Sequence, residues 1–510
     1  MTTVKNETPT TTNGRGPAPR GTLKSGSLQI TRRFTREGES VFDTVTWKKF
    51  TSRLTNEKGE VLHEMEVEAP DFYTQQTVDI ISSKYFRKAG VPQYDENGEP
   101  ILDEDGSPVL GAETSMRQVV HRLAGCWADW GKRLGYFDER NAQAFYDEVA
   151  WMLLHQYFAP NSPQWFNTGL YFAYGIDGTS KKRFYFDPEK GEVVESTSRY
   201  QRPEPMACYI GRILDNLTED SGIYEFLARE GRIFQAGAGS GANFSSLRAA
   251  GEPLSGGGES SGMMSFLKLF DRSAGAIKSG GTTRRAAKMV VVDVDHPEIE
   301  EFIWWKVNEE KKVAALVAAG YDSDWRGEAY QTVSGQNSNN SVSVSHDFME
   351  KVFSDGEWDL VARTTGESMK TLKARDLWRQ IAEAAWHSAD PGIQFNGTMN
   401  DWHTVPHIGP IRASNPCSEY LSIDDSACNL ASMRLTAFLG RDADGQPVFK
   451  VEEFVHAVRL ATVVLEISVA MAQLPDDIVA YNTYHLRNLG LGYADLGSLL
   501  MRCGLPYDSD

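Results

Sequence analysis

An amide, a thiol and a carboxylate fall at every second position in the segment 412–430, RASNPCSEYLSIDDSACNL: they are Asn415, Cys417 and Glu419. Side chains two residues apart in an extended segment point to the same face, so we expect the three groups to face one space. Pro416 fixes its own φ and removes a backbone donor, which stiffens the approach to the thiol. A carboxylate beside a thiol can act as a general base, and an amide can orient a substrate. The pattern equally suits a buried structural cysteine in a loop, because free cysteine is among the most buried residue types.

The composition is that of an ordinary soluble globular protein, with 510 residues, of which 41% are hydrophobic and 24% charged. The net charge of −18 argues against nucleic-acid binding, so any phosphate site has to be a local basic or glycine-rich feature. Five cysteines without a CxxC spacing predict a reducing, cytoplasmic location. Because the chain lacks an apolar run of about 18 residues and an apolar signal core, we expect no membrane span and no secretion.

Changes in composition and in the spacing of apolar residues along the chain predict four regions. Residues 1–26 are rich in Thr, Gly, Pro and Arg and are expected to form a disordered tail. Residues 27–114 hold short strand-like pieces and form an N-terminal extension. Residues 115–200 form a mainly helical domain, because apolar residues recur at helical spacing over 115–135 and 138–157. In residues 201–510, strand patterns alternate with helix patterns, which predicts the first part of an α/β sheet or barrel.

Two glycine-rich stretches could bring backbone close to a ligand. GAGSGANFSSLR, residues 237–248, lacks the G-x-G-x-x-G of a dinucleotide site, and its glycines suit either close ligand approach or a tight turn. SGGTTRRAAK, residues 279–288, offers amides, hydroxyls and two guanidiniums in an acidic chain, which favours phosphate binding over a solvated turn. It is no P-loop, because GxxxxGK[ST] is absent. His403 and His407 lie four positions apart, but Pro406 disfavours the helix that a metal pair needs, so no metal site is predicted.

Taken together, these pieces resemble the adenosylcobalamin-dependent (class II) ribonucleotide reductases. The matching stretches past the tail are LQITRRFTREGESVFDTVTW, NEKGEVLHEMEVEAPDFYTQQTVDIISSKYFR, NSPQWFNTG (161–169), MACYI (206–210), GSGANFSSLR (239–248), AGAIKSGGTTRRAAKMV (274–290), NPCSEY (415–420) and ACNLASM (427–433). NPCSEY, with a second cysteine eleven positions after the first and a distant cysteine in MACYI, is a specific combination. The resemblance implies a ten-stranded α/β barrel, incomplete here and preceded by a mainly helical N-terminal domain, with a finger loop inside the barrel.

The resemblance also implies a role for each matching residue. Cys417 is similar to the thiol that becomes a thiyl radical and abstracts the ribose 3′ hydrogen. Glu419 matches the group that takes the 3′-hydroxyl proton, and Asn415 matches a hydrogen-bond donor to the substrate. Cys208 and Cys428 match the pair that delivers reducing equivalents and ends as a disulfide. The residues that match substrate contacts are Ser162, Ala207, Cys208, Gly239, Asn415, Pro416, Cys417, Ser418 and Glu419. Those that match the effector site are Asp215, Gly280, Gly281, Thr282, Arg284 and Arg285, and residues 333–341 match the loop that relays effector identity.

The activity implied by the resemblance is reduction of ribonucleotides, with diphosphates favoured, to 2′-deoxyribonucleotides. It implies adenosylcobalamin as cofactor, a deoxynucleoside triphosphate as effector and a thioredoxin-type reductant, and it is compatible with a homodimer. The chain stops at LPYDSD, where the family's barrel would continue, so we expect the N-terminal portion of a longer enzyme. Two alternatives stay open: the iron-dependent class I large subunit, which shares the barrel and the cysteines, and a nucleotide-binding fragment without turnover. Pro416 and the N-terminal likeness favour the cobalamin class.

Overall fold

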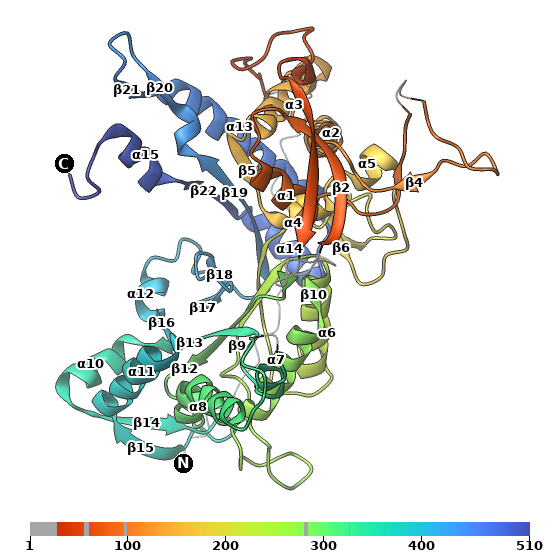
Figure 1. Cartoon of the computed structure of the whole chain (residues 1–510). Helices are drawn as coiled ribbons and strands as arrows, with labels where there is room; N and C mark the ends of the chain where they lie inside the picture. Colours follow the sequence, from red (N-terminus) through yellow and green to blue (C-terminus); the bar gives the residue numbers. More distant parts are fainter. Residues whose placement is uncertain (1–27, 56–60, 96–98, 280–283, 326, 510) are drawn as a thin grey trace.

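An eight-stranded sheet forms the centre of the computed structural model, which describes residues 28–55, 61–95, 99–279, 284–325 and 327–509 (Figure 1). The predicted tail at 1–26 lies outside these residues. The order along the sheet is β16, β13, β12, β9, β8, β19 and β22, and β5 pairs with β19 beside this path. These strands are β5 (Phe158–Pro160), β8 (Cys208–Gly211), β9 (Gly239–Asn243), β12 (Lys288–Asp293), β13 (Ser338–Val344), β16 (Gly392–Phe395), β19 (Ser426–Arg434) and β22 (Leu489–Ala494).

Five neighbouring strands, from β8 to β16, run parallel to one another. Strand β19 runs antiparallel to β8 and parallel to β22, so the direction of the sheet reverses between β8 and β19. Helices α6 (Ile223–Gln235), α7 (Met263–Ala276) and α8 (Ile299–Ala318) connect the parallel strands, as such crossovers require. The predicted α/β class is therefore confirmed. The described residues form this open sheet, and the closed ten-stranded barrel stays a prediction.

Alternate residues of β12 face two different cores, which explains its almost continuously apolar sequence. Val290 and Val292 pack against the helices in one hydrophobic cluster. Met289 and Val291 face the opposite side, where they belong to the same hydrophobic cluster as the buried cysteines Cys208 and Cys428. The inner face of the sheet is thus lined by the residues on which the site is built.

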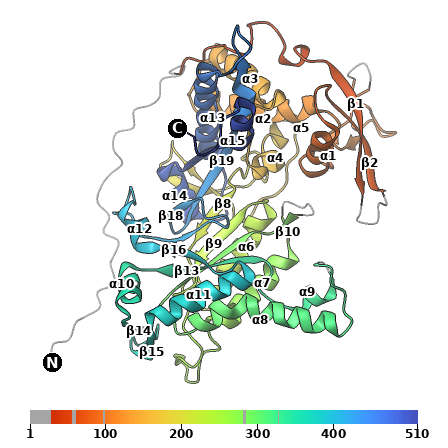
Figure 2. The same cartoon turned by 60° about the vertical axis from the view of Figure 1, so that its left-hand side comes forward.

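The N-terminal part contains the two helices that the sequence predicted, α2 (Met116–Arg133) and α3 (Glu139–Leu154). Ser115 caps α2 in a reciprocal capping box with Gln118, and Asp138 accepts a hydrogen bond of 2.9 Å from Asn141 N at the start of α3. Both helices pack in one core with the long hairpin of β1 (Trp47–Thr55) and β2 (Val61–Pro70), with α1 (Gln75–Lys84), and with α13 (Val451–Met471). Figure 2 shows α13 beside α2 and α3. The N-terminal helices therefore share a core with α13 and with β19, which both come late in the chain.

Helix α13 corrects the expectation that the chain has no apolar stretch of membrane-spanning length. Among the residues that the structure describes, α13 is long and apolar enough to cross a membrane, with a mean hydropathy of 1.7. More than half of that stretch, 56%, is buried inside the structure, as in the core helix of a globular protein. Most of its charged residues lie in its first half, where His456 Nε2 lies 2.7 Å from the carboxylate of Glu148. In its second half, Glu466 accepts a hydrogen bond of 2.6 Å from Tyr136 OH.

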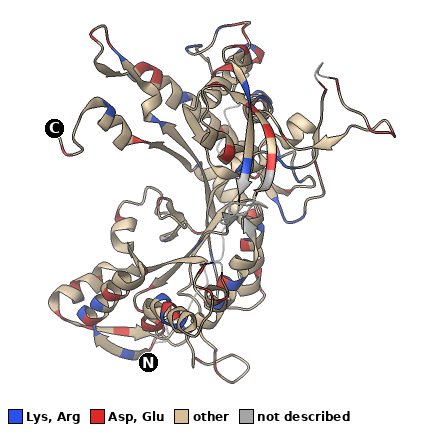
Figure 3. Cartoon of the chain, viewed as in Figure 1, with Lys and Arg blue, Asp and Glu red and all other residues tan. Residues whose placement is uncertain are grey.

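Most of the remaining elements are short. They are η1 (Val41–Asp43), β3 (Val91–Pro92), β4 (Leu110–Gly111), α4 (Ser162–Asn167), α5 (Leu170–Tyr174), β6 (Phe184–Asp187), β7 (Glu192–Glu195), β10 (Lys278–Ser279), β11 (Arg284–Arg285), α9 (Glu328–Thr332), α10 (His346–Ser354), β14 (Glu357–Val361), β15 (Ser368–Lys373), α11 (Ala374–Ser388), α12 (Asn396–Asp401), β17 (Ile411–Ser414), β18 (Leu421–Ile423), η2 (Leu435–Phe438), β20 (Leu439–Arg441), β21 (Pro447–Phe449), α14 (Asp477–Leu486) and α15 (Leu496–Cys503). Acidic and basic residues are mixed over the outer helices and loops, while the central strands carry few charges (Figure 3).

Candidate active site

A finger hairpin, formed by β17 and β18 with the turn 415–420 between them, lies across the inner face of the sheet. Glycines of β9 make room for it. A Cβ atom added to Gly241 would overlap the carbonyl oxygen of Ser414, and one added to Gly239 would lie 2.8 Å from Cγ of Pro416. Gly239 and Gly241 thus permit close approach of the finger, and Gly237 and Gly239 also line the cavity described below.

The tip of the finger corrects the expectation of an extended segment. Ser418 N donates a hydrogen bond of 3.1 Å to Asn415 O, which closes a turn, and Ser418 has a φ of +65°. That left-handed conformation is uncommon outside glycine and breaks the simple alternation of a strand. Asn415 is buried, whereas Cys417, Ser418 and Glu419 are exposed on the finger.

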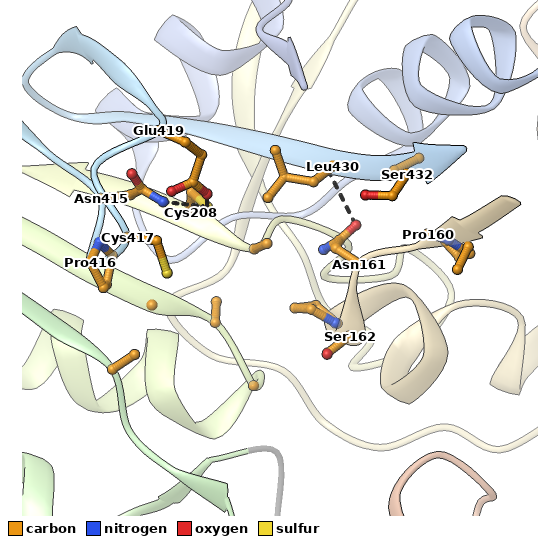
Figure 4. Close-up of a pocket in the computed structure, with 18 residues that line it drawn as sticks. Pro160, Asn161, Ser162, Cys208, Asn415, Pro416, Cys417, Glu419, Leu430 and Ser432 are labelled. Atoms are coloured by element: carbon orange, nitrogen blue, oxygen red, sulfur yellow. Dashed lines mark hydrogen bonds between the residues drawn. The ribbon is translucent and has the colours of Figure 1, made fainter. Parts of the chain in front are cut away.

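A cavity of about 330 Å³ lies between the finger, the inner face of the sheet and α4 (Figure 4). Its size is that of a small-molecule site. The predicted site residues that line it are Ser162, Ala207, Cys208, Gly239, Asn415, Pro416, Cys417 and Glu419. Ser418 is not among the lining residues: its Oγ accepts a hydrogen bond of 3.3 Å from Ser414 Oγ. Ser162 and Glu419, which lie 257 positions apart in the sequence, therefore meet at this cavity.

Asn415 and Glu419 both point toward the thiol of Cys208 (Figure 4). Asn415 Nδ2 lies 3.1 Å from Cys208 Sγ, and its Oδ1 accepts a hydrogen bond of 2.9 Å from Tyr420 N, which fixes the amide. The Cys208 thiol donates to Glu419 Oε1 over 3.6 Å. The finger thus presents an amide and a carboxylate to a thiol that comes from β8.

Cys208 and Cys428 are both buried free thiols, and they oppose each other in the antiparallel pair of β8 and β19. Burial, followed by the negative charge of Glu419, raises the pKa of Cys428 to about 12. Burial and then the same carboxylate also raise the pKa of Cys208 above its usual range. Both thiols are therefore held protonated near neutral pH, which keeps them inert until a base or an oxidant acts.

The opposite wall of the cavity comes from α4 and the residue before it. The backbone N–H of Asn161 donates a hydrogen bond of 2.9 Å to the carbonyl oxygen of Leu430 in β19. Its side-chain Nδ2 donates a second hydrogen bond, of 2.8 Å, to the carbonyl oxygen of Pro205. Tyr85 OH lies 3.3 Å from Ser162 Oγ. Sequence reasoning selected Ser162 but missed Asn161, although both stand in the same NSPQWFNTG stretch.

The predicted effector residues are only partly described. Gly280, Gly281 and Thr282 lie outside the described residues, and Arg284 and Arg285 form β11, paired with β10. Asp215 accepts a hydrogen bond of 2.6 Å from Arg248 Nε.

The described residues hold no group of three or more His, Cys, Asp or Glu side chains that could bind a metal. His403, one of the two histidines spaced four apart, has its Nε2 2.9 Å from the carbonyl oxygen of Gly409.

Comparison with known proteins gives the class of protein first. Residues 206–510, more than half of the chain, match the family model of the ribonucleotide reductase barrel domain. Residues 48–156 match the family model of class II vitamin B12-dependent ribonucleotide reductase. The chain therefore belongs to the ribonucleotide reductases, and within them to the vitamin B12-dependent class II, which decides against the class I large subunit.

Individual relatives agree with this assignment. A vitamin B12-dependent ribonucleotide reductase of Agrobacterium fabrum is 48% identical over 569 aligned positions, which cover 95% of this chain and 44% of the relative. One of Bradyrhizobium diazoefficiens is 47% identical and covers 94% and 45%. A relative from Thermoplasma acidophilum, named a vitamin B12-dependent ribonucleoside-diphosphate reductase, is 32% identical over 304 positions, 59% of this chain and 36% of the relative. The chain spans about half the length of the curated relatives it matches.

Proposed function

We propose that the complete protein reduces ribonucleotides to 2′-deoxyribonucleotides in the cavity beneath the finger hairpin. The observation that carries this proposal is that one cavity joins the Cys417 thiol and the Glu419 carboxylate to Cys208, with Cys428 directly behind it. The reaction balances on these groups: two thiols are oxidised to a disulfide, the 2′ carbon–oxygen bond is replaced by carbon–hydrogen, and one water leaves. A ribonucleoside diphosphate is the proposed substrate, because more distant relatives carry that name.

Each residue takes one part of the reaction in this proposal. Cys417, exposed at the rim of the cavity, carries the thiyl radical and abstracts the 3′ hydrogen. Glu419 takes the 3′-hydroxyl proton as general base. The side chain of Asn415 is held by the hydrogen bond that its Oδ1 accepts from Tyr420 N, and its Nδ2 donates a hydrogen bond to a hydroxyl group of the substrate. Cys208 and Cys428 deliver the hydrogen and the electrons, and the walls exclude water from the intermediates.

Adenosylcobalamin is the proposed cofactor, and when bound it supplies the radical. The cavity of about 330 Å³ suits a nucleotide and is too small for a corrin with its side chains. The exposed position of Cys417 leaves its thiol open to a large group that approaches from outside the cavity. No described residue is assigned to hold the cofactor.

The wider assembly forms the second part of the proposal. Within the described chain, β16 and β22 each pair on one side only, and these open edges support closure into a ten-stranded barrel by further chain. We also propose that a deoxynucleoside triphosphate binds at Asp215, Gly280, Gly281, Thr282, Arg284 and Arg285, that a thioredoxin-type protein restores the thiols, and that the enzyme is a cytoplasmic homodimer. Calorimetry with a deoxynucleoside triphosphate tests the effector site, since Arg284→Ala or Arg285→Ala is expected to weaken binding.

The deciding experiment measures deoxyribonucleotide formation by the full-length enzyme with and without adenosylcobalamin. Turnover only with the cofactor is expected, and Cys417→Ser is expected to abolish it while calorimetry shows nearly unchanged nucleotide affinity. Cys126→Ser, at a buried thiol of α2 away from the cavity, is the matched control and is expected to stay active. Nucleotide binding without turnover in the full-length protein would favour the alternative of a regulatory nucleotide-binding protein.

A further inference from the structure

Asn339, the second residue of β13, reaches the peptide bond that precedes Cys417. Its Nδ2 donates a hydrogen bond of 2.6 Å to the carbonyl oxygen of Pro416. The peptide bond is planar and the proline ring fixes φ, so ψ of Pro416 is the one soft dihedral left at this point. The direction of the carbonyl oxygen reports that ψ. The hydrogen bond from Asn339 therefore fixes the orientation of the peptide plane that leads into Cys417.

The rest of the finger is held in the same way, by neutral amides in place of a neighbouring strand. At its base, Asn396 and Asn400 both donate to Ile411 O, over 3.0 and 2.9 Å. Asn243 donates to Arg412 O over 3.1 Å. These amides hold the arm of the finger, whereas Asn339 acts at the tip, beside the thiol.

Asn339 itself stands on a segment that is firmly anchored. The carboxylate of Asp271 on α7, which is 1% exposed, accepts backbone hydrogen bonds of 2.8 Å each from Gly335 and Asn337. The backbone N–H of Ser334 donates a hydrogen bond of 2.9 Å to the carboxylate of Glu309 in α8. Hydrogen bonds therefore connect α7 and α8 to residues 334–337, and Asn339, two residues further on, connects to the finger.

We propose that Asn339 is a positioning residue that holds the Cys417 thiol in its reacting geometry and ties it to the segment 334–338. This proposal rests on the proposed function for its meaning in catalysis. Its structural content is independent of that function, because it concerns only how freely the tip of the finger moves. Asn339 does not line the cavity, so it acts through Pro416 and not on the substrate.

The first test uses the present chain and needs no turnover. The rate at which iodoacetamide alkylates Cys417, followed by peptide mapping, is compared between the wild type, Asn339→Ala and Asn339→Leu. Leucine keeps the approximate shape of asparagine and loses the donor. Cys417 is already exposed, so no opening is needed. Both variants are nevertheless expected to alkylate Cys417 about three-fold faster or more, because a tip freed from its hydrogen bond turns the thiol into more orientations that iodoacetamide can attack. Asn396→Ala is the matched control, because Asn400 still binds both the carbonyl oxygen and the N–H of Ile411, and its rate is expected to match the wild type.

The second test uses the full-length enzyme. Asn339→Leu is expected to lower kcat by about 10- to 100-fold with little change in KM, as for a misplaced reacting group. Wild-type alkylation rates in both Asn339 variants would overturn the proposal, whatever the activity. If the wild type shows no turnover while the alkylation rates change as expected, the proposed function fails and the positioning role stands. Urea unfolding of each variant confirms that the fold is retained.

Discussion

Cys208 and Cys428 lie directly opposite each other in the antiparallel pair of β8 and β19. Opposed residues in such a pair have Cα atoms about 4.5 to 5.5 Å apart, within the range that a disulfide requires. Both side chains belong to the same small hydrophobic cluster on the inner face of the sheet. Two cysteines separated by 220 positions in the sequence can therefore be joined without moving the backbone.

The first prediction follows from this pairing. Mild oxidation of the chain with diamide is expected to form the Cys208–Cys428 disulfide in preference to any other. Peptide mapping under non-reducing conditions measures the linked peptides. Cys208→Ser is expected to remove the product, and Cys126→Ser is expected to leave it unchanged. Recovery of both thiols free, or of Cys417 as the preferred partner of either, would contradict the pairing.

The second prediction concerns Glu419, whose charge adds to burial in raising the pKa of both thiols. A raised thiol pKa means less thiolate at a given pH, so wild-type oxidation is expected to speed up steadily from pH 7 to 10 without levelling off. Glu419→Gln removes the charge and lowers both pKa values, and each unit of lowering gives about ten-fold more thiolate. Disulfide formation at pH 8 is therefore expected to be faster in this variant. Slower formation would mean that the carboxylate acts as the base that deprotonates Cys208.

The third prediction tests how closely the finger packs on the sheet. In Gly241→Ala the added methyl group would overlap the backbone of Ser414, and backbone cannot move aside as a flexible side chain does. A loss of about 1 to 3 kcal/mol in the free energy of unfolding is expected, as for overpacking of a core. Gly256→Ala is the control, because nothing lies within 4 Å of its added Cβ. Urea unfolding of the two variants measures the difference, and equal midpoints would contradict the packing.

Local patterns in the sequence predicted the helices well. Helical spacing indicated α2 and α3 to within a few residues. In the structure, Ser115 and Asp138 cap the beginnings of these two helices. The apolar run before residue 294 likewise indicated β12. The signal in each case is carried by neighbours along the chain, which is the information that a single sequence holds.

The arrangement of the site was beyond such reasoning, for reasons that the finger makes plain. Its tip is a turn because Ser418 takes a left-handed conformation, which no local residue pattern announced. Asn339 and Asn243 act on the finger from separate strands, and their role depends on which strands become neighbours. The resemblance selected Cys208 and Cys428 together, whereas the residues' own spacing gave no reason to pair them.

The fourth prediction concerns the wall of the cavity opposite the finger. Arg122 and Glu113 form an ion pair that is 0% exposed on both sides, with Nε to Oε1 at 2.7 Å. Nη1 of Arg122 also donates to the carbonyl oxygens of Trp165 and Thr168, over 3.0 and 2.8 Å, at the C-terminal end of α4. The pair therefore fastens to α2 the helix that carries Ser162.

Removing one partner of this pair leaves the other charge buried without compensation. Arg122→Met or Glu113→Gln is expected to lower the free energy of unfolding by about 3 to 5 kcal/mol. The double variant is expected to lose clearly less than the sum of the two, because it buries no unpaired charge. Urea unfolding of the four chains gives the coupling energy. Additive losses would show that the two side chains act independently, and that Arg122 stabilises the protein through the α4 carbonyls alone.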